Sequence, residues 1–407
     1  MTSTPWSEGP ESGGHFTPAT RTCATDRVHE RLLREVPGYA ERRAACETQT
    51  WRAERTEGAP GRSGVTTIPV VVHVVHRTDA EDIPEQQIAS QLATLNADFR
   101  NQNADGAAVP EPFVGLRGDA RVMFELATTD PDGNPTDGIT RTRTTVEGFT
   151  DDDAVKSAVT GGADAWPADR YLNLWVCQLA AGLLGYAQFP GGPEATDGVV
   201  ITHTACGSTG TATAPFNLGR TATHEVGHWL NLRHIWGDDG TGCAGSDFVA
   251  DTPNQGGPNY GKPTFPQISC GNGPNGDMFV NFMDYVDDAA MVMFTAEQTV
   301  RMEELRQAQA ELERGIGAVS SEYRTLKQQV AALEEEERRE REAAALRAAV
   351  AAGTIRSVGG FVFPVDGPHS FTDTWGDPRS GGRTHQGADV FAVRGTPCVA
   401  CYTGTIN

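Results

Sequence analysis

Three histidines and a glutamate lie within the eleven residues from His224 to His234, in the pattern HExxHxxxxxH. On a helix, His224 and His228 share one face a turn apart, so they can chelate one metal ion. Glu225 is placed to take a proton from a metal-bound water, and His234 adds a third nitrogen after the helix turns away. Three protein ligands and one open position are typical of catalytic zinc, whereas structural zinc usually has four protein ligands. The spacing therefore predicts a hydrolytic zinc site.

The HExxH motif alone is a weak signal, because an amphipathic helix with surface histidine and glutamate gives the same letters by chance. A second segment strengthens it. Asn281-Phe282-Met283-Asp284-Tyr285 follows the histidine helix after a loop and resembles the Met-turn that lies beneath the zinc of metzincins. Met283 could instead be an ordinary core residue, since methionine fills irregular gaps in many cores. The third histidine and this segment together favour the metal site.

The resemblance extends beyond these two motifs. HEVGHWLNLRHIWGDD and CGNGPNGDMFVNFMDYVDDAAMVMFT resemble the pappalysin family of metzincins, specifically its bacterial ulilysin-like (cytophagalysin) branch. The likeness continues through IPVVVHVVH, LNADFRNQNAD, YLNLWVCQL and LGYAQFPG, and it covers about residues 15–302. Asn231 stands where the general metzincin pattern has glycine, but asparagine tolerates the positive φ of a helix exit better than most residues.

The resemblance implies a zinc-dependent endopeptidase and assigns roles to several residues. Glu225 would be the general base, and Tyr285 would bind the zinc or hydrogen-bond the oxyanion. Cys243 and Cys270 would form a disulfide in a loop that is poor in apolar residues. Relatives often cut beside basic residues through an acidic pocket near the Met-turn. The candidates for that pocket are Asp287 and Asp288, although surface acids are the commoner explanation.

Residues 1–62 resemble the pro-segment of the family. The stretch Arg21-Thr22-Cys23-Ala24-Thr25 resembles its RxCGT signature, with Ala24 in place of glycine. The resemblance implies that the Cys23 thiolate fills the open zinc position and keeps a precursor latent. An unpaired surface thiol is the alternative. The stretch Gly58–Gly64 is rich in glycine and contains Arg62, so we expect maturation near Arg62-Ser63.

The loop after His234 is rich in glycine and in carboxylates, including Asp238 and Asp239. Oxygen ligands of this kind suit calcium, and some ulilysin-like relatives bind calcium in this loop. No EF-hand spacing is present. The calcium ligands expected here are Asp247, Asp251 and Thr252.

Strand and helix patterns alternate up to the histidine helix. Apolar and β-branched runs predict strands over residues 65–75, 121–128, 171–178 and 198–202. Helical spacing predicts helices over residues 27–34, 84–99 and 151–160. We therefore expect residues 63–302 to form an α/β (α+β) metzincin catalytic domain with a twisted mixed sheet and a zinc helix. Gly185-Tyr186-Ala187 is expected to line the cleft by pairing its main chain with the substrate.

The sequence changes character after residue 302. Within residues 303–352, apolar side chains alternate four and three apart, which predicts a coiled-coil helix. The seam consists of Leu312, Ile316, Val319, Tyr323, Leu326, Val330 and Leu333. This seam could mediate self-association, or the helix could form an intramolecular stalk.

Residues 353–407 resemble the start of a LytM/lysostaphin-type peptidoglycan endopeptidase domain, which would be a partial all-β module. His385 and Asp389, within HQGAD, match two zinc ligands of that family, but no later HxH completes the site. Two ligands hold a metal weakly, so we expect this module to be non-catalytic. A cell-wall endopeptidase acting through this module, and a non-enzymatic coiled-coil scaffold, are the alternatives to the zinc endopeptidase.

The 407-residue chain has a formal charge of −21, which argues against nucleic acid and anionic membrane surfaces as partners. Protein or peptide substrates remain. No stretch approaches the roughly 20 apolar residues of a membrane span. Met1–Pro10 has no secretory signal pattern, whereas the family resemblance implies secretion. We expect Zn²⁺ as the cofactor, with Ca²⁺ as a candidate second ion.

Overall fold

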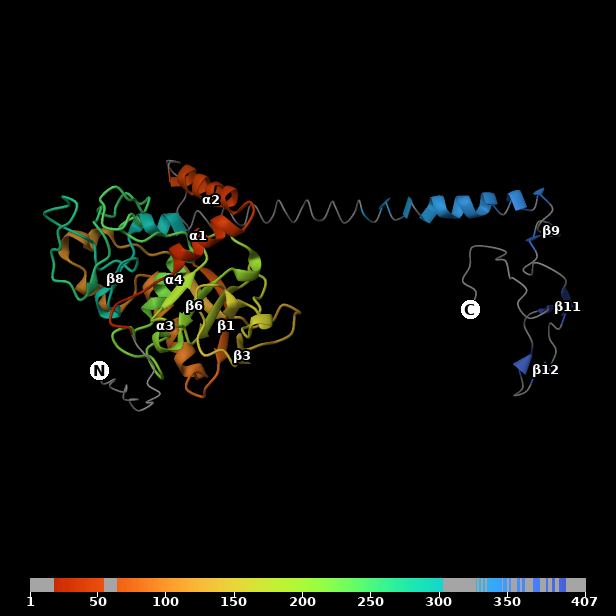
Figure 1. Cartoon of the computed structure of the whole chain (residues 1–407), viewed down its shortest axis with the longest axis horizontal. Coiled ribbons are helices and arrows are strands. Elements are labelled where there is room, and N and C mark those ends of the chain that lie inside the picture. The colour runs from red at the N-terminus through yellow and green to blue at the C-terminus, as the bar shows by residue number, and fades with distance from the viewer. Residues whose placement is uncertain are drawn as a thin grey trace, which may run out of the picture. The chain divides into compact units, whose positions relative to one another are not determined.

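The computed structural model describes residues 18–54 and 64–302, helical residues between 327 and 351, and strand segments between 357 and 392. The chain divides into two units, residues 1–313 and 314–407. Figure 1 shows the chain with its elements labelled. Within the described ranges, no helix combines the length and the apolar character needed to cross a membrane.

A six-stranded mixed sheet forms the centre of the first unit, as the sequence predicted. The strands pair in the order β2-β1-β4-β6-β5, and β3 pairs with the second half of β1. Every pair is parallel except β5 with β6, so β5 is an antiparallel edge strand. The bounds are β1 (Thr66–His76), β2 (Val122–Leu126), β3 (Ile139–Arg143), β4 (Leu172–Cys177), β5 (Gly185–Ala187) and β6 (Val199–Thr202).

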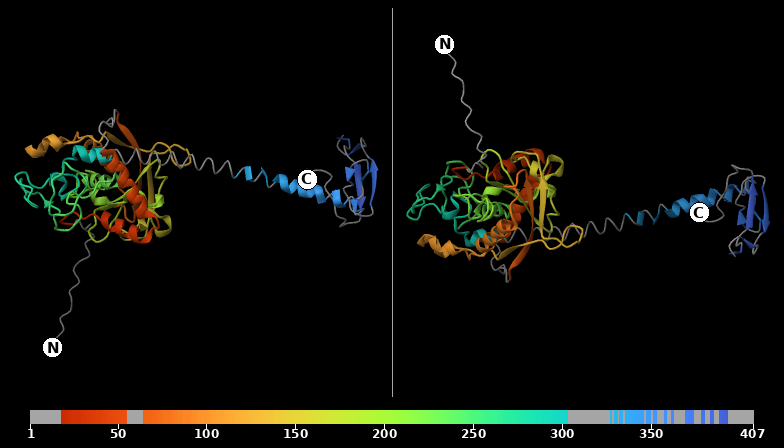
Figure 2. Two further views of the ribbon diagram at one scale, coloured as in Figure 1. Left: turned by 90° about the horizontal axis from the view of Figure 1, so that it is seen from above. Right: turned by 90° about the horizontal axis from the view of Figure 1, so that it is seen from below.

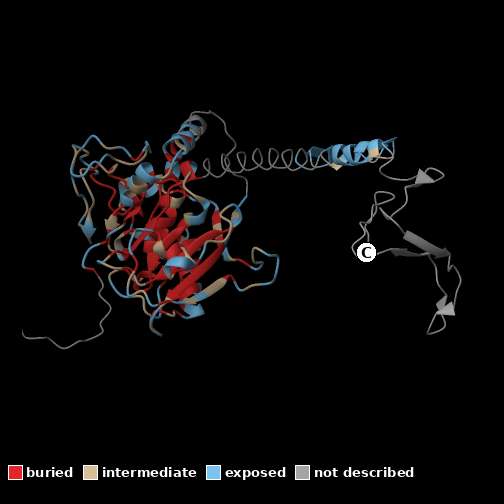
Figure 3. Cartoon of the chain, turned by 45° about the vertical axis from the view of Figure 1, so that its right-hand side comes forward, coloured by how far each residue is buried: buried red, intermediate tan, exposed pale blue. Residues whose placement is uncertain are grey.

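Side chains alternate between the two faces of a strand, and this alternation explains why both faces of the sheet are covered. Val70 and Val72 of β1 belong to the main apolar core, which includes residues of α3 (Glu85–Phe99) and α4 (Arg220–Trp229). Val71, between them, belongs to a separate cluster. Figure 2 shows the helices against the sheet from two further directions. Figure 3 shows that the buried residues concentrate in the sheet and in the helices beside it.

Two helices precede the sheet in the predicted pro-segment, α1 (Thr25–Glu35) and α2 (Tyr39–Glu54). Helix α1 confirms the helix predicted over residues 27–34, and it packs against β5. Helix α2 was not predicted. Its contacts with the rest of the chain include ionic ones, since Glu47 pairs with Arg301 at 2.6 Å, and such contacts leave no apolar period in the sequence.

The helix predicted over residues 151–160 is wrong. Asp153 has a φ of 64°, which a helix interior does not accommodate, and the Asp152 carboxylate accepts a hydrogen bond from the Ala154 amide. Two short 3-10 helices take its place, η3 (Ala154–Lys156) and η4 (Ala158–Thr160). Strand β3 was also missed, because its alternating arginine and threonine residues carry almost no apolar signal.

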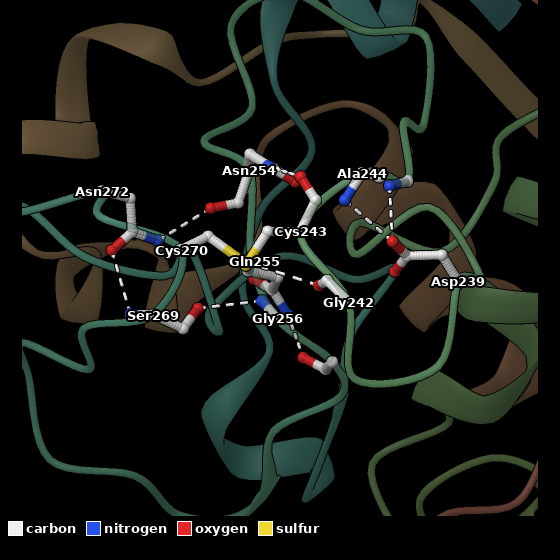
Figure 4. Close-up of a disulfide and its surroundings, with 12 residues drawn as sticks. Asp239, Gly242, Cys243, Ala244, Asn254, Gln255, Gly256, Ser269, Cys270 and Asn272 are labelled. Atoms are coloured by element: carbon white, nitrogen blue, oxygen red, sulfur yellow. Dashed lines mark hydrogen bonds between the residues drawn. A yellow bond between two sulfur atoms is a disulfide. The ribbon is translucent and has the colours of Figure 1, made fainter.

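The part of the first unit that follows the zinc helix is irregular. A disulfide joins Cys243 to Cys270, as the family resemblance implied, and Figure 4 shows it with the surrounding hydrogen bonds. The only regular pairing described in this part is between β7 (Tyr260–Gly261) and β8 (Tyr285–Val286). The remaining 3-10 helices of this unit are η1 (Ala104–Ala108), η2 (Glu111–Leu116), η5 (Glu194–Thr196), η6 (His203–Ala205) and η7 (Asp288–Ala290).

The second unit contains helical residues up to 351, followed by short strands. Val330 and Leu333 of the predicted seam are exposed there, and the other five seam residues lie outside the described ranges. Among the described strands of this unit, β11 and β14 form the longest paired segment, with five residue pairs. The bounds are β9 (Ser357–Val358), β10 (Phe361–Val362), β11 (His369–Asp373), β12 (Pro378–Arg379), β13 (Arg383–Thr384) and β14 (Ala388–Ala392).

Candidate active site and metal centre

The three histidines of the motif converge on one point at the end of α4. His224 Nε2 lies 3.1 Å from His228 Nε2 and 3.3 Å from His234 Nε2, and the last two are 3.1 Å apart. All three side chains are buried. A zinc ion with Zn–N bonds of about 2.0–2.1 Å in tetrahedral geometry separates its nitrogen ligands by roughly 3.3 Å. The spacing of the imidazoles therefore fits zinc.

The outer nitrogens of the histidines show which way the rings face. His224 Nδ1 donates to the Phe282 carbonyl and His228 Nδ1 to the Leu232 carbonyl, both at 2.8 Å. His234 Nδ1 donates to the Asp238 carboxylate at 2.6 Å. Carbonyl and carboxylate oxygens only accept, so the proton of each neutral ring is on Nδ1 and the lone pair is on Nε2. Three lone pairs directed at one another repel, and a cation between them removes that repulsion.

Burial and the neighbouring histidines lower the pKa of His224 well below its usual range and that of His228 to about 3. Both rings are therefore neutral near pH 7, as metal ligands must be. Burial also opposes charge on His234, but Tyr285 and the carboxylates of Asp238 and Asp26 outweigh it and raise the pKa of His234. A carboxylate that orients a metal-binding imidazole in this way is a common partner of zinc sites.

The exit from α4 brings His234 back to the other two histidines. Asn231 adopts a φ of 75°, the left-handed conformation for which glycine is usual and asparagine is tolerated. The Leu232 amide then donates to the Gly227 carbonyl at 2.9 Å, which turns the chain sharply. The replacement of glycine by asparagine at residue 231 is thus compatible with the site.

The segment predicted as the Met-turn lies directly against the zinc helix. A Cβ atom added at Gly227 of α4 would lie 2.5 Å from the Met283 sulfur, so glycine is required for this close packing. Met283 is fully buried, and the preceding Phe282 supplies the carbonyl that holds His224. This segment therefore packs against α4 through Met283 and orients His224 through Phe282.

Glu225 lies on α4 beside His224 and is buried against β5. A Cβ atom added at Gly185 would lie 2.9 Å from Glu225 Cγ, so the glycine of the edge strand makes room for this side chain. Glu225 Oε2 accepts hydrogen bonds from Thr25 Oγ1 at 3.0 Å and from Cys23 Sγ at 3.3 Å. Burial raises the pKa of Glu225 to about 7. A carboxyl group with such a pKa can both accept and donate a proton near neutrality.

Cys23 reaches the same point from the pro-segment. Its sulfur and the three imidazole nitrogens all lie within 4.8 Å of one another. The pro-segment is held there by main-chain bonds to β5, from the Ala24 amide to the Gly185 carbonyl and from the Leu184 amide to the Thr22 carbonyl, each 3.1 Å long. Burial, with Glu225 adding to it, raises the pKa of the Cys23 thiol to about 12. A bound zinc ion would reverse that effect by stabilising the thiolate.

Arg21, two residues before Cys23, is buried against Asp288. Its guanidinium lies 2.5 Å from the Asp288 carboxylate and donates to Thr221 Oγ1 at 3.0 Å and to the Val286 carbonyl at 3.2 Å. Arg21 and Asp288 are almost completely buried. Of the two acids proposed for an acidic pocket, Asp288 is thus the one beside a basic side chain, and Asp287 is only half-buried.

Tyr285 packs beside two of the three histidines. Its ring centroid is 4.9 Å from that of His234 and 5.7 Å from that of His224. Trp236 packs edge-on against the same tyrosine, with the centroids 4.8 Å apart. The ring of Tyr285 is therefore a direct neighbour of the three-histidine cluster.

The residues proposed as calcium ligands line two adjacent cavities, both of which Thr252 borders. Thr252 Oγ1 donates to Asp247 Oδ2 at 2.8 Å, and both residues line a cavity of about 200 Å³. Asp251 instead lines an adjacent cavity of about 260 Å³, and its Oδ2 accepts from the Glu297 amide. Calcium binding by these residues stays a prediction.

The two ligands proposed for a second zinc site belong to the second unit. Asp389 lies on β14 opposite Thr372, and His385 lies outside the described ranges. A second zinc site formed by His385 and Asp389 stays a prediction.

Three residues near the metal centre were not identified from the sequence. Asp26 Oδ2 accepts from His234 Nδ1 at 3.1 Å, alongside Asp238, and Thr25 joins Glu225 to the Ala187 amide of β5. Asp238 could have been found from its position four residues after His234. Asp26 and Thr25 gave no such signal, because only the fold brings the pro-segment to α4.

Comparison with known proteins agrees with this geometry. The family model described as pregnancy-associated plasma protein-A, of peptidase family M43, matches residues 154–307. An extracellular metalloprotease of Colletotrichum graminicola is 33% identical over 247 residues, which are 58% of this chain and 74% of the relative. An extracellular metalloprotease of Verticillium alfalfae is 32% identical over 60% of this chain and 81% of the relative.

Solved structures are also similar to this chain. A mutant of Tannerella forsythia promirolysin superposes with a TM-score of 0.65 and 49% identity, over 70% of this chain and 93% of that one. Mature mirolysin of the same organism, in complex with a cleaved peptide, gives a TM-score of 0.58 and 54% identity, over 59% and 91%.

The chain belongs to the pappalysin family of metzincin metalloproteases, peptidase family M43. It is a zinc-dependent endopeptidase made as a latent precursor.

Proposed function

We propose that His224, His228 and His234 hold the catalytic zinc and that Glu225 is the general base and acid of peptide hydrolysis. The observation that carries this proposal is the convergence of three Nε2 atoms within 3.3 Å, each ring oriented through Nδ1, beside a buried carboxylate. When bound there, Zn²⁺ supplies a Lewis acid that polarises the scissile carbonyl and makes water acidic enough to lose a proton near neutral pH.

The protein groups then divide the work. Glu225 accepts the proton of the attacking water at its carboxylate and later gives it to the leaving amine. The Tyr285 hydroxyl is placed to donate a hydrogen bond to the oxyanion. The Leu184 amide and the Gly185 carbonyl bond the pro-segment in this structure, and an extended substrate can pair with them once the pro-segment has left.

Latency follows from the position of Cys23. In the precursor its thiol lies where the substrate carbonyl and the water would react, and it contacts Glu225. Residues 1–62 are the proposed pro-segment and 63–302 the catalytic domain, with maturation near Arg62-Ser63. The cut itself falls outside the described residues.

The buried pair of Arg21 and Asp288 supports a preference for substrates with arginine. A bidentate or forked contact with a buried carboxylate is geometrically specific for a guanidinium. We infer that a substrate arginine close to the scissile bond takes the place of Arg21 in this pocket.

Replacement of Glu225 tests the mechanism. Glu225→Ala in the mature enzyme should reduce cleavage of an arginine-containing peptide by at least about 10²–10⁴-fold, because general acid–base catalysis is removed. Zinc content should stay at one ion per chain, since the variant keeps all three ligands. Glu194→Ala is the matched control, because that glutamate is exposed on η5. Retained cleavage in Glu225→Ala would exclude this base.

The specificity is tested with Asp288→Asn and Asp287→Asn on a mixed peptide library. The first should abolish the preference for arginine, and the second should leave it intact. Asp288 also accepts from the Leu218 amide at 2.7 Å, so thermal stability must be measured with the same samples. Loss of preference in Asp287→Asn alone would reassign the pocket.

Further proposals concern other parts of the chain. The relatives are named extracellular metalloproteases, which supports secretion of this protein. We propose a coiled-coil segment over residues 303–352, which could self-associate, and a LytM-like module over residues 353–407. Calcium bound by Asp247, Asp251 and Thr252 would stabilise the loop after the zinc helix, and its removal by a calcium chelator should lower the melting temperature.

A further inference from the structure

Helix α1 does more than follow Cys23, because it covers a charged and apolar surface beside β5. Arg27 pairs with Asp151 at 3.1 Å. Arg31, one helical turn later, pairs with Asp153 and donates to the Asp151 carbonyl at 3.2 Å. The two arginines thus hold α1 on the loop that replaces the predicted helix of residues 151–160.

The residue after each arginine is apolar and buried. Val28 and Leu32 belong to the same apolar cluster as Phe149, Leu179 and Leu183, which all lie in the proposed catalytic domain. Side chains four apart share one face of a helix, so α1 presents two arginine-apolar pairs to this surface. The contact therefore combines apolar burial with two ion pairs.

The mature enzyme would present this surface with unbalanced charge. Asp151, Asp152 and Asp153 carry three negative charges, and the buried Lys156 pairs with Asp153 at 2.9 Å. Arg27 and Arg31 supply the two positive charges that balance the group in the precursor. Removal of the pro-segment leaves an apolar surface with a net charge of −2 at its rim.

The surface is continuous with the substrate-binding edge. Thr25, the first residue of α1, accepts a hydrogen bond from the Ala187 amide at the end of β5. A peptide that pairs with β5 and continues in the direction of α1 therefore reaches the acidic loop without a gap.

We propose that this surface, formed by Phe149, Asp151, Asp153, Leu179 and Leu183, is an exosite that recruits substrates carrying a helical segment with an arginine-apolar pair repeated every four residues. The proposal rests on the proposed function, in that the pro-segment must leave before the exosite is free. Helix α1 shows the chemistry that this surface binds, because its arginines pair with the acidic residues while Val28 and Leu32 cover the apolar ones. Recruitment raises the effective concentration of the scissile bond, so it lowers KM for such substrates.

The first arm of the test measures kcat/KM of the mature enzyme for two fluorogenic probes. One is a short arginine-containing peptide, and the other joins it to the sequence of residues 25–36 through a glycine-serine linker, at either end. The joined probe should be cleaved with a kcat/KM about 10-fold higher, consistent with a second, intramolecular contact. Asp151→Arg should bring the ratio for the two probes down to about 1, as should a joined probe with glutamine at both arginine positions.

Asp169→Arg is the matched control, because Asp169 is exposed near the start of β4, away from the loop of residues 149–156, and its ion pair with Arg170 spans 4.0 Å. This variant should keep the 10-fold ratio. Equal kcat/KM for the two probes in the wild-type enzyme, or an unchanged ratio in Asp151→Arg, would overturn the exosite.

The second arm needs no catalysis. Binding of the peptide of residues 25–36 to mature Glu225→Ala protein is followed by fluorescence anisotropy. It should weaken at least about 5-fold in Asp151→Arg and weaken with added salt, because ion pairs contribute to it. If the short probe is not cleaved at all, the proposed function has failed, and the binding arm still decides the exosite: no measurable binding refutes it.

Discussion

Replacement of Arg21 by alanine should open the latent precursor. The Arg21 guanidinium makes three hydrogen bonds, one of which is also its ion pair with Asp288, and it stacks over Phe216 with its central carbon 5.0 Å from the ring centroid. These contacts exist only while the pro-segment occupies the cleft. Their loss therefore shifts the equilibrium between the closed precursor and a form in which Cys23 has left the metal centre.

The size of this shift follows from the burial of the pair. Removing one partner of a buried ion pair costs about 3–5 kcal/mol. The lower end applies here, because Asp288 keeps its bond from the Leu218 amide and water can enter the emptied pocket. A loss of about 3 kcal/mol raises the open population roughly 150-fold. Arg21→Lys keeps the positive charge but lacks the several N–H donors of the guanidinium. It should weaken the closed precursor by about 1–2 kcal/mol and raise the open population about 10-fold.

Alkylation of Cys23 reports the open population directly. Zinc-loaded precursor carrying Glu225→Gln, which prevents self-cleavage, is treated with iodoacetamide, and the rate at each cysteine is read by peptide mass spectrometry. Cys46 on α2 is partly exposed and serves as an internal reference. Arg34→Ala is the matched control, because its pair with Glu30 is 3.9 Å long and exposed. Equal rates at Cys23 in Arg21→Ala, Arg34→Ala and the parent protein would refute the contribution of the Arg21–Asp288 pair to latency.

Three further predictions concern the metal centre and the sheet. Asp238→Asn should weaken zinc binding about 10–100-fold in the mature enzyme, measured by zinc release to a competing chelator, because His234 loses its orienting carboxylate. Gly227→Ala should lower the free energy of unfolding by about 1–3 kcal/mol in urea titrations, since its methyl group would overlap Met283; an unchanged midpoint would contradict that packing. Burial lowers the pKa of His73 to about 4, below the 6.5 of an unfolded chain. The unfolded chain therefore takes up a proton at this ring more readily than the folded protein does. The free energy of unfolding is thus unaffected by His73 above pH 6.5 and falls as the pH decreases from 6.5 towards 4. Between pH 7 and pH 5 this amounts to about 2 kcal/mol, and His73→Gln should reduce the fall in stability by that amount.

The metal centre could be predicted from the sequence because its parts obey local rules. Helical spacing places His224 beside His228, and a residue tolerant of positive φ at Asn231 allows the turn to His234. The partners that orient these ligands depend on contacts between distant segments. Asp26 and His234 are 208 residues apart, and Arg21 and Asp288 are 267 apart. No periodicity in the sequence carries that information.

The fold shows the same division. Strands β1 and β4 are buried on both faces and were recognised from their continuous apolar runs. Strand β3 and helix α2 are stabilised by main-chain pairing and by ion pairs, which leave no apolar period. The false helix over residues 151–160 arose because three consecutive acids suit a helix start, whereas Asp153 instead turns the chain so that its carboxylate meets Lys156 and Arg31.

The pro-segment inhibits through several separate contacts rather than through the thiol alone. Arg21 pairs with Asp288, Cys23 and Thr25 bind Glu225, and α1 contacts the loop that contains Asp151 and Asp153. On α2, Glu47 adds its pair with Arg301. The expected maturation cut, near Arg62-Ser63, lies outside the described residues. Hydrolysis of one peptide bond there leaves the contacts named above in place, so latency ends when the severed pro-segment dissociates or is degraded. The strength of its contacts, and not the cut, then sets how quickly activity appears.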